Sequence, residues 1–308
     1  MMRWIAGLGL KFRFLVVILA GVLMAFGMAQ LRNMPVDVAA QHSQTSVKEF
    51  ENFDSKNFSR STQINNEWFP LKPGTRFVYE GVTIEDGERV AHRVVSTVTD
   101  LTKVIGGVRA VVAHDLDYSA GELVEAEIVF FAQDKNGTVW HLGEYPEEYE
   151  DGKFVAAPAW IHGAQEARAG IVMKAEPRLG TPSYAQGWAP AVNWTDRGAV
   201  DQVGQKTCVP LDCYEDVLVI AETSQQEPDA HQLKYFARGV GNVRVGWRGA
   251  GEKTQETLEL VECVQLGPQA LAEARAEALK LEKRAYEIRK DVYAHTPPAE
   301  HTPGVEGQ

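Results

Sequence analysis

The sequence predicts a mainly β protein: an antiparallel meander that forms a curved sheet, half-barrel or sandwich, with an N-terminal transmembrane helix and a C-terminal amphipathic helix. Three observations predict this class. Short β-rich runs follow one another through residues 67–265, with turn signals between them. These runs lack the strand–helix alternation that builds parallel sheets. A mostly apolar segment precedes them, and a helical apolar stripe follows them.

Turn sequences separate the predicted strands. Asp86-Gly87 and Asp151-Gly152 suit the positive φ that tight hairpins require, and Asn136-Gly137 ends a further turn. The predicted strands cover residues 76–85, 90–99, 108–118, 123–133, 138–143, 217–222, 232–237, 242–247 and 257–264. Consecutive strands joined by hairpins pair as antiparallel neighbours, so we expect a meandering sheet.

Residues 158–214 interrupt this pattern with prolines, glycines and tryptophans. We interpret them as an elaborated region that covers one face of the sheet. Trp160, Trp188 and Trp194 are the candidate ligand-binding residues, because large rings in loops could line an apolar site. The alternative is that the rings act as lids and plugs for the protein's own core.

Residues 1–40 are predicted to be a membrane anchor or signal segment. Three cations precede residues 14–31, which would span roughly 27 Å as a helix, close to a hydrocarbon core of about 30 Å. The cations place the N-terminus in the cytoplasm. We therefore predict a single-pass inner-membrane protein, anchored through residues 14–31, whose C-terminal domain is periplasmic or extracellular. A cleaved signal peptide ending near Gly27-Met28-Ala29 stays open.

Residues 2–38 resemble the opening of heavy-metal efflux pumps of the resistance-nodulation-division class. The resemblance rests on residues 2–5 (Met-Arg-Trp-Ile), 12–17 (Phe-Arg-Phe-Leu-Val-Val) and 31–38 (Leu-Arg-Asn-Met-Pro-Val-Asp-Val). In those pumps the segment forms the first transmembrane helix and its exit into the periplasm. The resemblance therefore implies this topology and a Gram-negative-type inner membrane, and it implies no transport activity.

Two polar segments flank the β-rich domain. Residues 41–66 are predicted to be a linker, although Phe50, Phe53 and Phe58 could dock on the domain. Residues 295–308, which include three prolines, are predicted to be a disordered tail.

A C-terminal helix is predicted over residues 266–294, with Pro268 in its first turn. Its apolar residues recur every three or four positions and form a heptad stripe: Leu271, Ala274, Ala278, Leu281, Ala285, Ile288 and Val292. The stripe predicts a helix that docks on the protein's own sheet. The alternative is a coiled-coil homodimer through residues 268–294.

The chain has three cysteines. Cys208 and Cys213 are predicted to form a disulfide, which would close a short loop in an oxidising compartment. Their spacing differs from that of the common zinc sites. Cys263 is left over and is expected to be buried in the last strand.

No sequence motif points to catalysis. The chain has no nucleophile elbow, phosphate loop, zinc-protease motif or dinucleotide fingerprint, so we predict no catalytic residue and no cofactor, and an enzyme is the least favoured class. The histidines have no metal-ligand spacing, and a metal site stays open.

Two acidic stretches are candidates for a site. The strand over His114-Asp115-Leu116-Asp117 places both carboxylates on one face, where they could bind calcium or share a proton. A solvated strand face is the preferred interpretation. The run over residues 145–152 is interpreted as a solvated hairpin tip.

The β-rich domain resembles a group of uncharacterised exported bacterial proteins. The shared motifs are residues 69–75 (Phe-Pro-Leu-Lys-Pro-Gly-Thr), 131–137 (Phe-Ala-Gln-Asp-Lys-Asn-Gly) followed by Val139-Trp140, and 235–241 (Tyr-Phe-Ala-Arg-Gly-Val-Gly). The resemblance spans most of residues 66–262 and implies no activity.

These observations predict a cell-envelope protein. A net charge of −11 without a basic stripe argues against a nucleic-acid partner. The preferred function is binding of an apolar or lipid-like small molecule on the curved sheet. The alternatives are a metal-handling accessory protein of the envelope and a structural envelope protein without a ligand.

Overall fold

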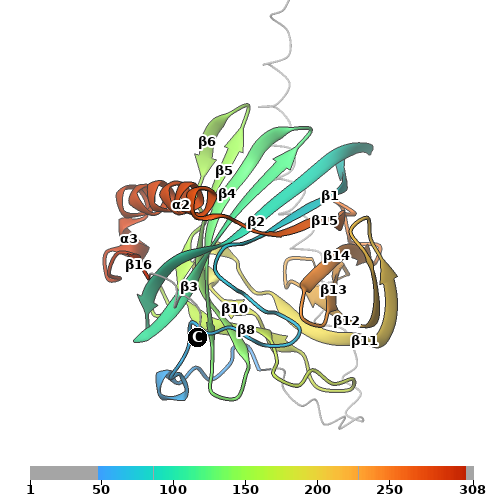
Figure 1. Ribbon diagram of the computed structural model, residues 1–308, viewed down its shortest axis with the longest axis horizontal. Helices are drawn as coiled ribbons and strands as arrows, with labels where there is room; N and C mark the ends of the chain where they lie inside the picture. The colour runs from blue at the N-terminus through green and yellow to red at the C-terminus, as the bar shows by residue number, and fades with distance from the viewer. Residues whose placement is uncertain (1–47, 86, 228, 303–308) are drawn as a thin grey trace, which may run out of the picture. The chain divides into compact units, whose positions relative to one another are not determined.

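The computed structural model describes residues 48–85, 87–227 and 229–302. They form an antiparallel sheet of 16 strands with C-terminal helices packed on it (Figure 1). The predicted mainly β, antiparallel class with a C-terminal helix is therefore confirmed. No helix in the described ranges has the length and apolar character needed to cross a membrane. The predicted transmembrane segment, residues 14–31, lies outside those ranges.

The strands follow the predicted meander, with several of them longer than expected. They are β1 Thr75–Glu85, β2 Glu88–Ile105, β3 Val108–Ser119, β4 Glu122–Gln133, β5 Val139–Glu150, β6 Lys153–Ala156, β7 Trp160–Ile161, β8 Arg168–Met173, β9 Tyr184–Ala185, β10 Gly187–Trp188, β11 Arg197–Cys208, β12 Cys213–Thr223, β13 His231–Ala237, β14 Gly241–Arg248, β15 Thr257–Gln265 and β16 Glu300–His301. The helices are α2 Pro268–Ile288 and α3 Lys290–Tyr293, with 3-10 turns at Ser55–Asn57 and Pro190–Val192.

The curved sheet nearly closes on itself. Its strands are ordered β10-β8-β5-β4-β3-β2-β1-β15-β14-β13-β12-β11-β9. Both ends belong to one short segment, because β9 pairs with β11 and β10 pairs with β8. Gly170 of β8 permits this approach, since a Cβ atom there would lie 2.1 Å from the backbone nitrogen of Gly187.

An apolar core fills one part of the interior. Alternate residues of the strands point inward, as the period of two requires, and β-branched and aromatic residues predominate there. The buried members include Phe77, Tyr79, Val98, Val111, Val139, Leu218, Ile220, Phe236, Val243, Val245, Leu258 and Leu260. Ile64, Trp68 and Leu71, which precede β1, also pack into this core.

Strands β2 to β5 are apolar on their outer face as well, because α2 covers it (Figure 1). Ile128 and Phe130 belong to the same core cluster as Ala278, Leu281 and Ala285 of the helix. The helical stripe is thus used against the protein's own sheet, and a coiled-coil homodimer through residues 268–294 would have to use other residues.

Residues 158–214 are part of the sheet and do not merely cover a face of it, which corrects the prediction. Five strands lie in this region, and β11 is 12 residues long. Its pairing with β12 shifts register three times between Val200 and Thr207. These irregularities break the alternation of buried and exposed residues by which strands are recognised in a sequence.

The polar flanks are also docked. Phe53 and Phe58 pack against Trp140, with ring centroids 5.6 and 6.2 Å apart, so residues 48–66 are not a free linker. Residues 295–302 are not a disordered tail: β16 pairs with β2, and Arg109 donates a hydrogen bond of 2.9 Å to Glu300. A polar segment can dock wherever an edge backbone or a few aromatic contacts are available.

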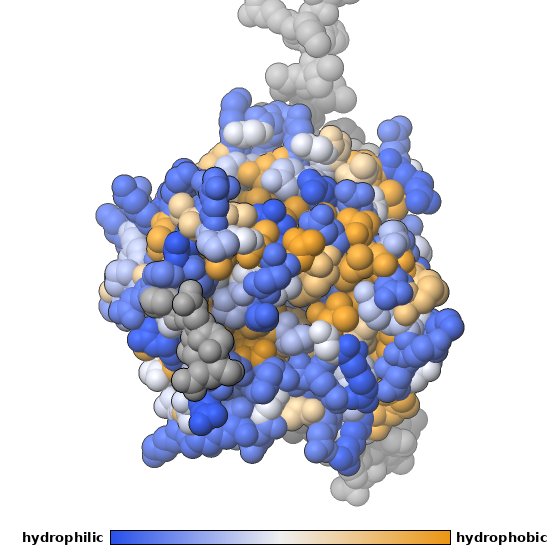
Figure 2. Space-filling model, in the orientation of Figure 1, coloured by the Kyte–Doolittle hydropathy of each residue, from blue (hydrophilic) through white to orange (hydrophobic). Residues whose placement is uncertain are grey.

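Exposed apolar side chains come from several elements. Phe154 and Val155 of β6, Val203 of β11 and Ile288 of α2 are each at least 38% exposed. The face in Figure 2 shows apolar residues near its centre with charged residues around them. Isolated apolar side chains of this kind are common on protein surfaces.

Candidate functional site

The inner faces of β3, β4 and β5 carry carboxylates beyond the apolar core. Asp115 and Asp117 of β3 pair with Glu127 and Glu125 of β4, so all four side chains share the inner face. Glu144 of β5 faces the same way and is 6% exposed. The shared face of the two aspartates was predicted correctly, but it is only partly solvated, because Asp115 and Asp117 are half-buried.

Sequence reasoning missed the glutamates of β4, although a signal was present. Glu125-Ala126-Glu127 repeats the alternation of Asp115-Leu116-Asp117 on the next strand of a predicted hairpin. Two such strands paired in register bring four carboxylates together, whichever face they occupy.

The opposite wall of the interior adds further charge. Glu222 of β12 and Lys234 of β13 face inward, while Glu256 immediately precedes β15 and Asp196 immediately precedes β11. The Lys234 ammonium lies 2.7 Å from the Glu222 carboxylate. Burial alone would lower the pKa of Lys234, but Glu222 outweighs this and raises it, so the ammonium stays charged.

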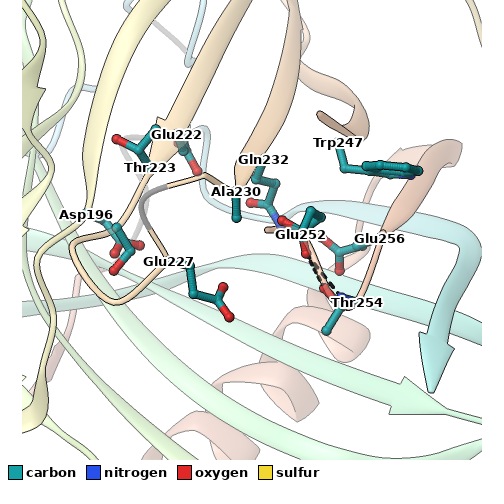
Figure 3. A pocket seen from close by; sticks show the side chains of 11 residues that line it. Asp196, Glu222, Thr223, Glu227, Ala230, Gln232, Trp247, Glu252, Thr254 and Glu256 are labelled. Carbon is teal, nitrogen blue, oxygen red and sulfur yellow. Dashed lines mark hydrogen bonds between the residues drawn. The ribbon is translucent and has the colours of Figure 1, made fainter. Parts of the chain in front are cut away.

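A pocket of about 200 Å³ opens on this wall (Figure 3). It is lined by Asp196, Glu222, Thr223, Ser224, Glu227, Ala230, Gln232, Trp247, Glu252, Thr254 and Glu256. Five of these residues are acidic and none is basic. The Trp247 ring is 39% exposed and stands beside Glu256. The pocket therefore combines negative charge with an open aromatic face.

The inner carboxylates raise one another's pKa. Burial, and next the charge of Asp117, raises the pKa of Glu125 to about 8. Burial and the neighbouring Glu144 raise the pKa of Glu127 well above its usual value. Each carboxylate in the group thus disfavours ionisation of the next.

The same causes act nearer the pocket. Burial raises the pKa of Asp115 to about 6 in spite of a hydrogen bond from Ser96. Burial, and next the charge of Glu222, raises the pKa of Asp196 to about 6. Asp196 lines the pocket and Asp115 does not, but both side chains are half-buried, so their charged forms are less well hydrated than in water.

His92 of β2 lies between two carboxylates, that of Asp117 on β3 and that of Glu256 just before β15. Its Nε2 lies 2.6 Å from Asp117, and its Nδ1 lies 3.2 Å from Glu256. Burial alone would lower the pKa of His92, but hydrogen bonds and charge from the two carboxylates outweigh it and raise the pKa to about 10. His92 is therefore an imidazolium at neutral pH.

Three enclosed polar atoms in this interior have no hydrogen-bond partner: Asp115 Oδ1, His141 Nε2 and the Tyr184 hydroxyl. Tyr184 is 2% exposed, and it shares the inner face with Glu222 because both residues flank Gly198 in the register. His141 Nε2 lies 3.3 Å from Glu144 without hydrogen-bond geometry. Buried polar groups normally have hydrogen-bond partners, so these atoms retain unused hydrogen-bonding capacity.

The arrangement of the acidic groups does not suit a metal ion. Among the residues that the structure describes, no group of three or more His, Cys, Asp or Glu side chains could hold one. Metal ions need several ligands converging on one point. Carboxylates spread over opposite walls fit a cation whose charge is carried on an extended organic skeleton.

The predicted tryptophans lie elsewhere. Trp160 is 2% exposed and packs with Trp194, with ring centroids 6.0 Å apart. Trp188 is half-buried and pairs with Arg168 across β10 and β8. None of the three lines the acidic pocket, and their role in ligand binding stays a prediction. Trp247 does line the pocket. It was placed on a predicted strand, but alternation alone does not show which face of that strand is enclosed.

The predicted disulfide between Cys208 and Cys213 is present and joins facing positions of β11 and β12. Cys263 lies in β15, as expected, but it is exposed and not buried. The end of this strand from Glu262 to Gln265 is exposed throughout, because it extends past the core.

The acidic run over residues 145–152 is not wholly a solvated tip. Glu147 is fully buried and accepts hydrogen bonds from Tyr145 (2.6 Å), Tyr149 (2.5 Å) and Arg284 (2.7 Å). The strand continues to Glu150 and helix α2 supplies the arginine, so only the last residues reach solvent.

Comparisons with known proteins add no function. No protein-family model matches the chain, and no curated protein matches it. Two solved structures are similar: a "putative exported protein" with a YmcC-like fold from Bacteroides fragilis, at 12% identity and a TM-score of 0.38, and a "putative lipoprotein" from Parabacteroides distasonis, at 13% identity and a TM-score of 0.37. Each alignment covers 64% of this chain and 98% of the other. Scores at this level do not establish a shared fold.

Proposed function

We propose that this chain is a cell-envelope binding protein whose acidic pocket holds a small organic ammonium ion. The observation that carries the proposal is a pocket lined by five carboxylates, one open tryptophan ring and no basic residue. Carboxylates pair with ammonium groups through charge-assisted hydrogen bonds. An aromatic face adds a cation–π contact of about 0.5–1 kcal/mol at an exposed site.

The size of the pocket limits the ligand. About 200 Å³ is below the roughly 300–1,000 Å³ typical of sites for drug-sized molecules. Two of the lining carboxylates, those of Asp196 and Glu252, have no basic partner within 4.0 Å in the described ranges. These two carboxylates are therefore available to bind an amine of a few carbon atoms.

An apolar or lipid-like ligand has less support. The apolar part of the interior is occupied by the protein's own buried side chains, whereas the open part is acidic. A lipid tail among the core residues inside the sheet would have to displace their side chains, which typically costs about 1–3 kcal/mol for each overpacked site.

The envelope location rests on two features. Residues 14–31 form a mostly apolar segment preceded by cations, which is typical of an anchor or signal segment. The Cys208–Cys213 disulfide is of a kind that forms and persists in oxidising compartments outside the cytoplasm. A fusion reporter active only in the periplasm, placed after residue 302, tests the location.

The ligand is tested by calorimetry with three four-carbon compounds: 1,4-diaminobutane, uncharged 1,4-butanediol and anionic succinate. We expect only the diamine to bind. Glu252→Gln should weaken binding about tenfold, the usual scale for one hydrogen bond to a charged group, and Trp247→Leu should weaken it by a smaller factor. Glu259→Gln is the matched control, because Glu259 lies in β15, three residues after Glu256, and is paired with Arg244 outside the pocket. Equal binding of the diol, or no binding of the diamine at millimolar concentration, would contradict the proposal.

A further inference from the structure

Behind the pocket lies a second group of carboxyls: Asp115, Glu125, Glu127 and Glu144, on the neighbouring strands β3, β4 and β5. Asp115 pairs with Glu127 in the register, and Glu144 lies on the same face of the next strand, so carboxyls from three strands gather on one face. Burial and mutual repulsion favour the protonated form in such a cluster, and they raise the pKa of Glu127 well above its usual value.

Charged groups face this cluster from every strand around it. The bases are His92, His141 and Lys234, and the remaining acids are Asp117, Glu148, Asp196, Glu222 and Glu256. Asp196 interacts electrostatically with both Glu222 of the pocket and Glu144 of the inner cluster. Charge that enters the pocket is thus felt by the inner carboxyls across a poorly hydrated interior.

Polar atoms with unused hydrogen-bonding capacity lie on the same inner face. The Tyr184 hydroxyl, which is 2% exposed, lacks a partner and shares the inner face with Glu222. His141, which is 6% exposed, has its Nε2 3.3 Å from Glu144 without hydrogen-bond geometry. These two side chains are independent of the carboxyl cluster and can hydrogen-bond a polar ligand.

We infer that the cation and the protons of the inner carboxyls exchange with each other, so that the protein takes up its organic ammonium ligand as it releases protons to solvent. The inference rests on the proposed function. In each exchange the O–H bond of one buried carboxylic acid breaks, the proton leaves to the buffer, and the carboxylate that remains compensates the ammonium charge. The ligand is not altered.

The direction of the pH effect follows. Burial and mutual repulsion raise the pKa of Asp115 to about 6 and that of Glu125 to about 8. Raising the pH through this range removes protons from these carboxyls. The cavity becomes more negative and binds the cation more tightly. Lowering the pH protonates the carboxyls and weakens binding of the cation. The site therefore binds its ligand at neutral pH and releases it in acid.

Isothermal titration with 1,4-diaminobutane at about pH 7, in phosphate and in Tris, tests the inference, because the two buffers differ in their heat of protonation. We expect the heat to differ between buffers by an amount that corresponds to on the order of one proton released per ligand. Affinity should rise roughly tenfold from about pH 6 to about pH 7.

Glu127→Gln keeps the side chain uncharged and able to donate a hydrogen bond, as the protonated acid does. We expect this variant to fold, to bind the diamine and to release fewer protons, whereas Glu259→Gln should behave as the native chain. Binding with the same heat in both buffers would overturn the proton exchange and leave the proposed function intact. No binding heat in either buffer would overturn the proposed function and this inference with it.

Discussion

Two clusters of charged side chains lie on opposite faces of the sheet. On the outer face, Lys103 is fully buried and donates to Glu282 (2.8 Å), to the Tyr286 hydroxyl (2.9 Å) and to the carbonyl of Pro297 (2.7 Å). All three ammonium protons are thereby used. On the inner face, Asp115 Oδ1 has no partner. The satisfied cluster stabilises the fold, and the unsatisfied one is the candidate site.

Removing the outer cation should destabilise the protein strongly. In Lys103→Met the carboxylate of Glu282 stays buried without its cation, and loss of one partner of a buried pair costs about 3–5 kcal/mol. Denaturant unfolding measures this loss. Lys280→Met is the control: its ion pair with Glu277 is exposed on the same helix, so we expect a change of less than about 1 kcal/mol. Similar losses in both variants would contradict the assigned role of Lys103.

At the residue scale, alternation along a strand identifies which side chains share a face. It correctly placed Asp115 with Asp117, and the short spacing of Cys208 and Cys213 correctly identified the disulfide. It did not show that the aspartates point inward, because both faces of a strand have the same period and enclosure depends on how the sheet curves.

At the scale of elements, the closing segment is the least regular part of the fold. Residues 184–188 pair with β11 through two residues and with β8 through two others. Such short ladders contribute few hydrogen bonds, so their stability depends on close packing against Gly170 and Trp160. This dependence explains why the segment carried no strand signal that could be read from the sequence.

A side chain at Gly170 should therefore open the sheet at this point. In Gly170→Ala the added Cβ would meet the backbone at 2.1 and 2.2 Å, which a main chain cannot easily avoid. We expect a loss of about 1–3 kcal/mol, the range for overpacked sites, together with faster amide exchange over residues 184–188. Gly246→Ala is the matched strand control, since its Cβ would find its nearest atom at 3.7 Å and we expect a change within about 1 kcal/mol. Normal exchange at 184–188 in Gly170→Ala would rule out this closure.

At the scale of the whole molecule, the interior is divided between an apolar core and an acidic cavity. The same strands contribute to both, with apolar residues along one part of their inner faces and carboxylates along the rest. At neutral pH the folded state retains protons on carboxyls that would be ionised in the unfolded chain, because enclosure penalises the charged carboxylates.

Stability should consequently fall as the pH rises above about 6.5. The pKa of Glu125 is raised to about 8 and that of His92 to about 10, so between pH 6.5 and 8 the native state binds more protons than the unfolded state. Each extra proton gives about 1.4 kcal/mol per pH unit, so the two groups together predict a slope of about 2 kcal/mol per pH unit. His114, whose pKa burial lowers to about 4, acts in the opposite direction only below its usual value. Denaturant midpoints from pH 6.5 to 9 measure the effect, and Glu125→Gln should reduce the slope while His92 maintains the remainder; a rise in stability over this range would contradict it.

The sequence by itself determined the antiparallel meander, the disulfide and a C-terminal helix with an apolar stripe, because turn dipeptides, a short cysteine spacing and helical periodicity act over a few neighbouring residues. Only the tertiary structure decided that the sheet nearly closes, that β11 belongs to it, and that the polar flanks dock. It also decided which face of β3 and β4 is enclosed. The physical reason is that enclosure and pKa depend on groups brought together from strands far apart in the chain. Local sequence patterns do not identify such tertiary contacts.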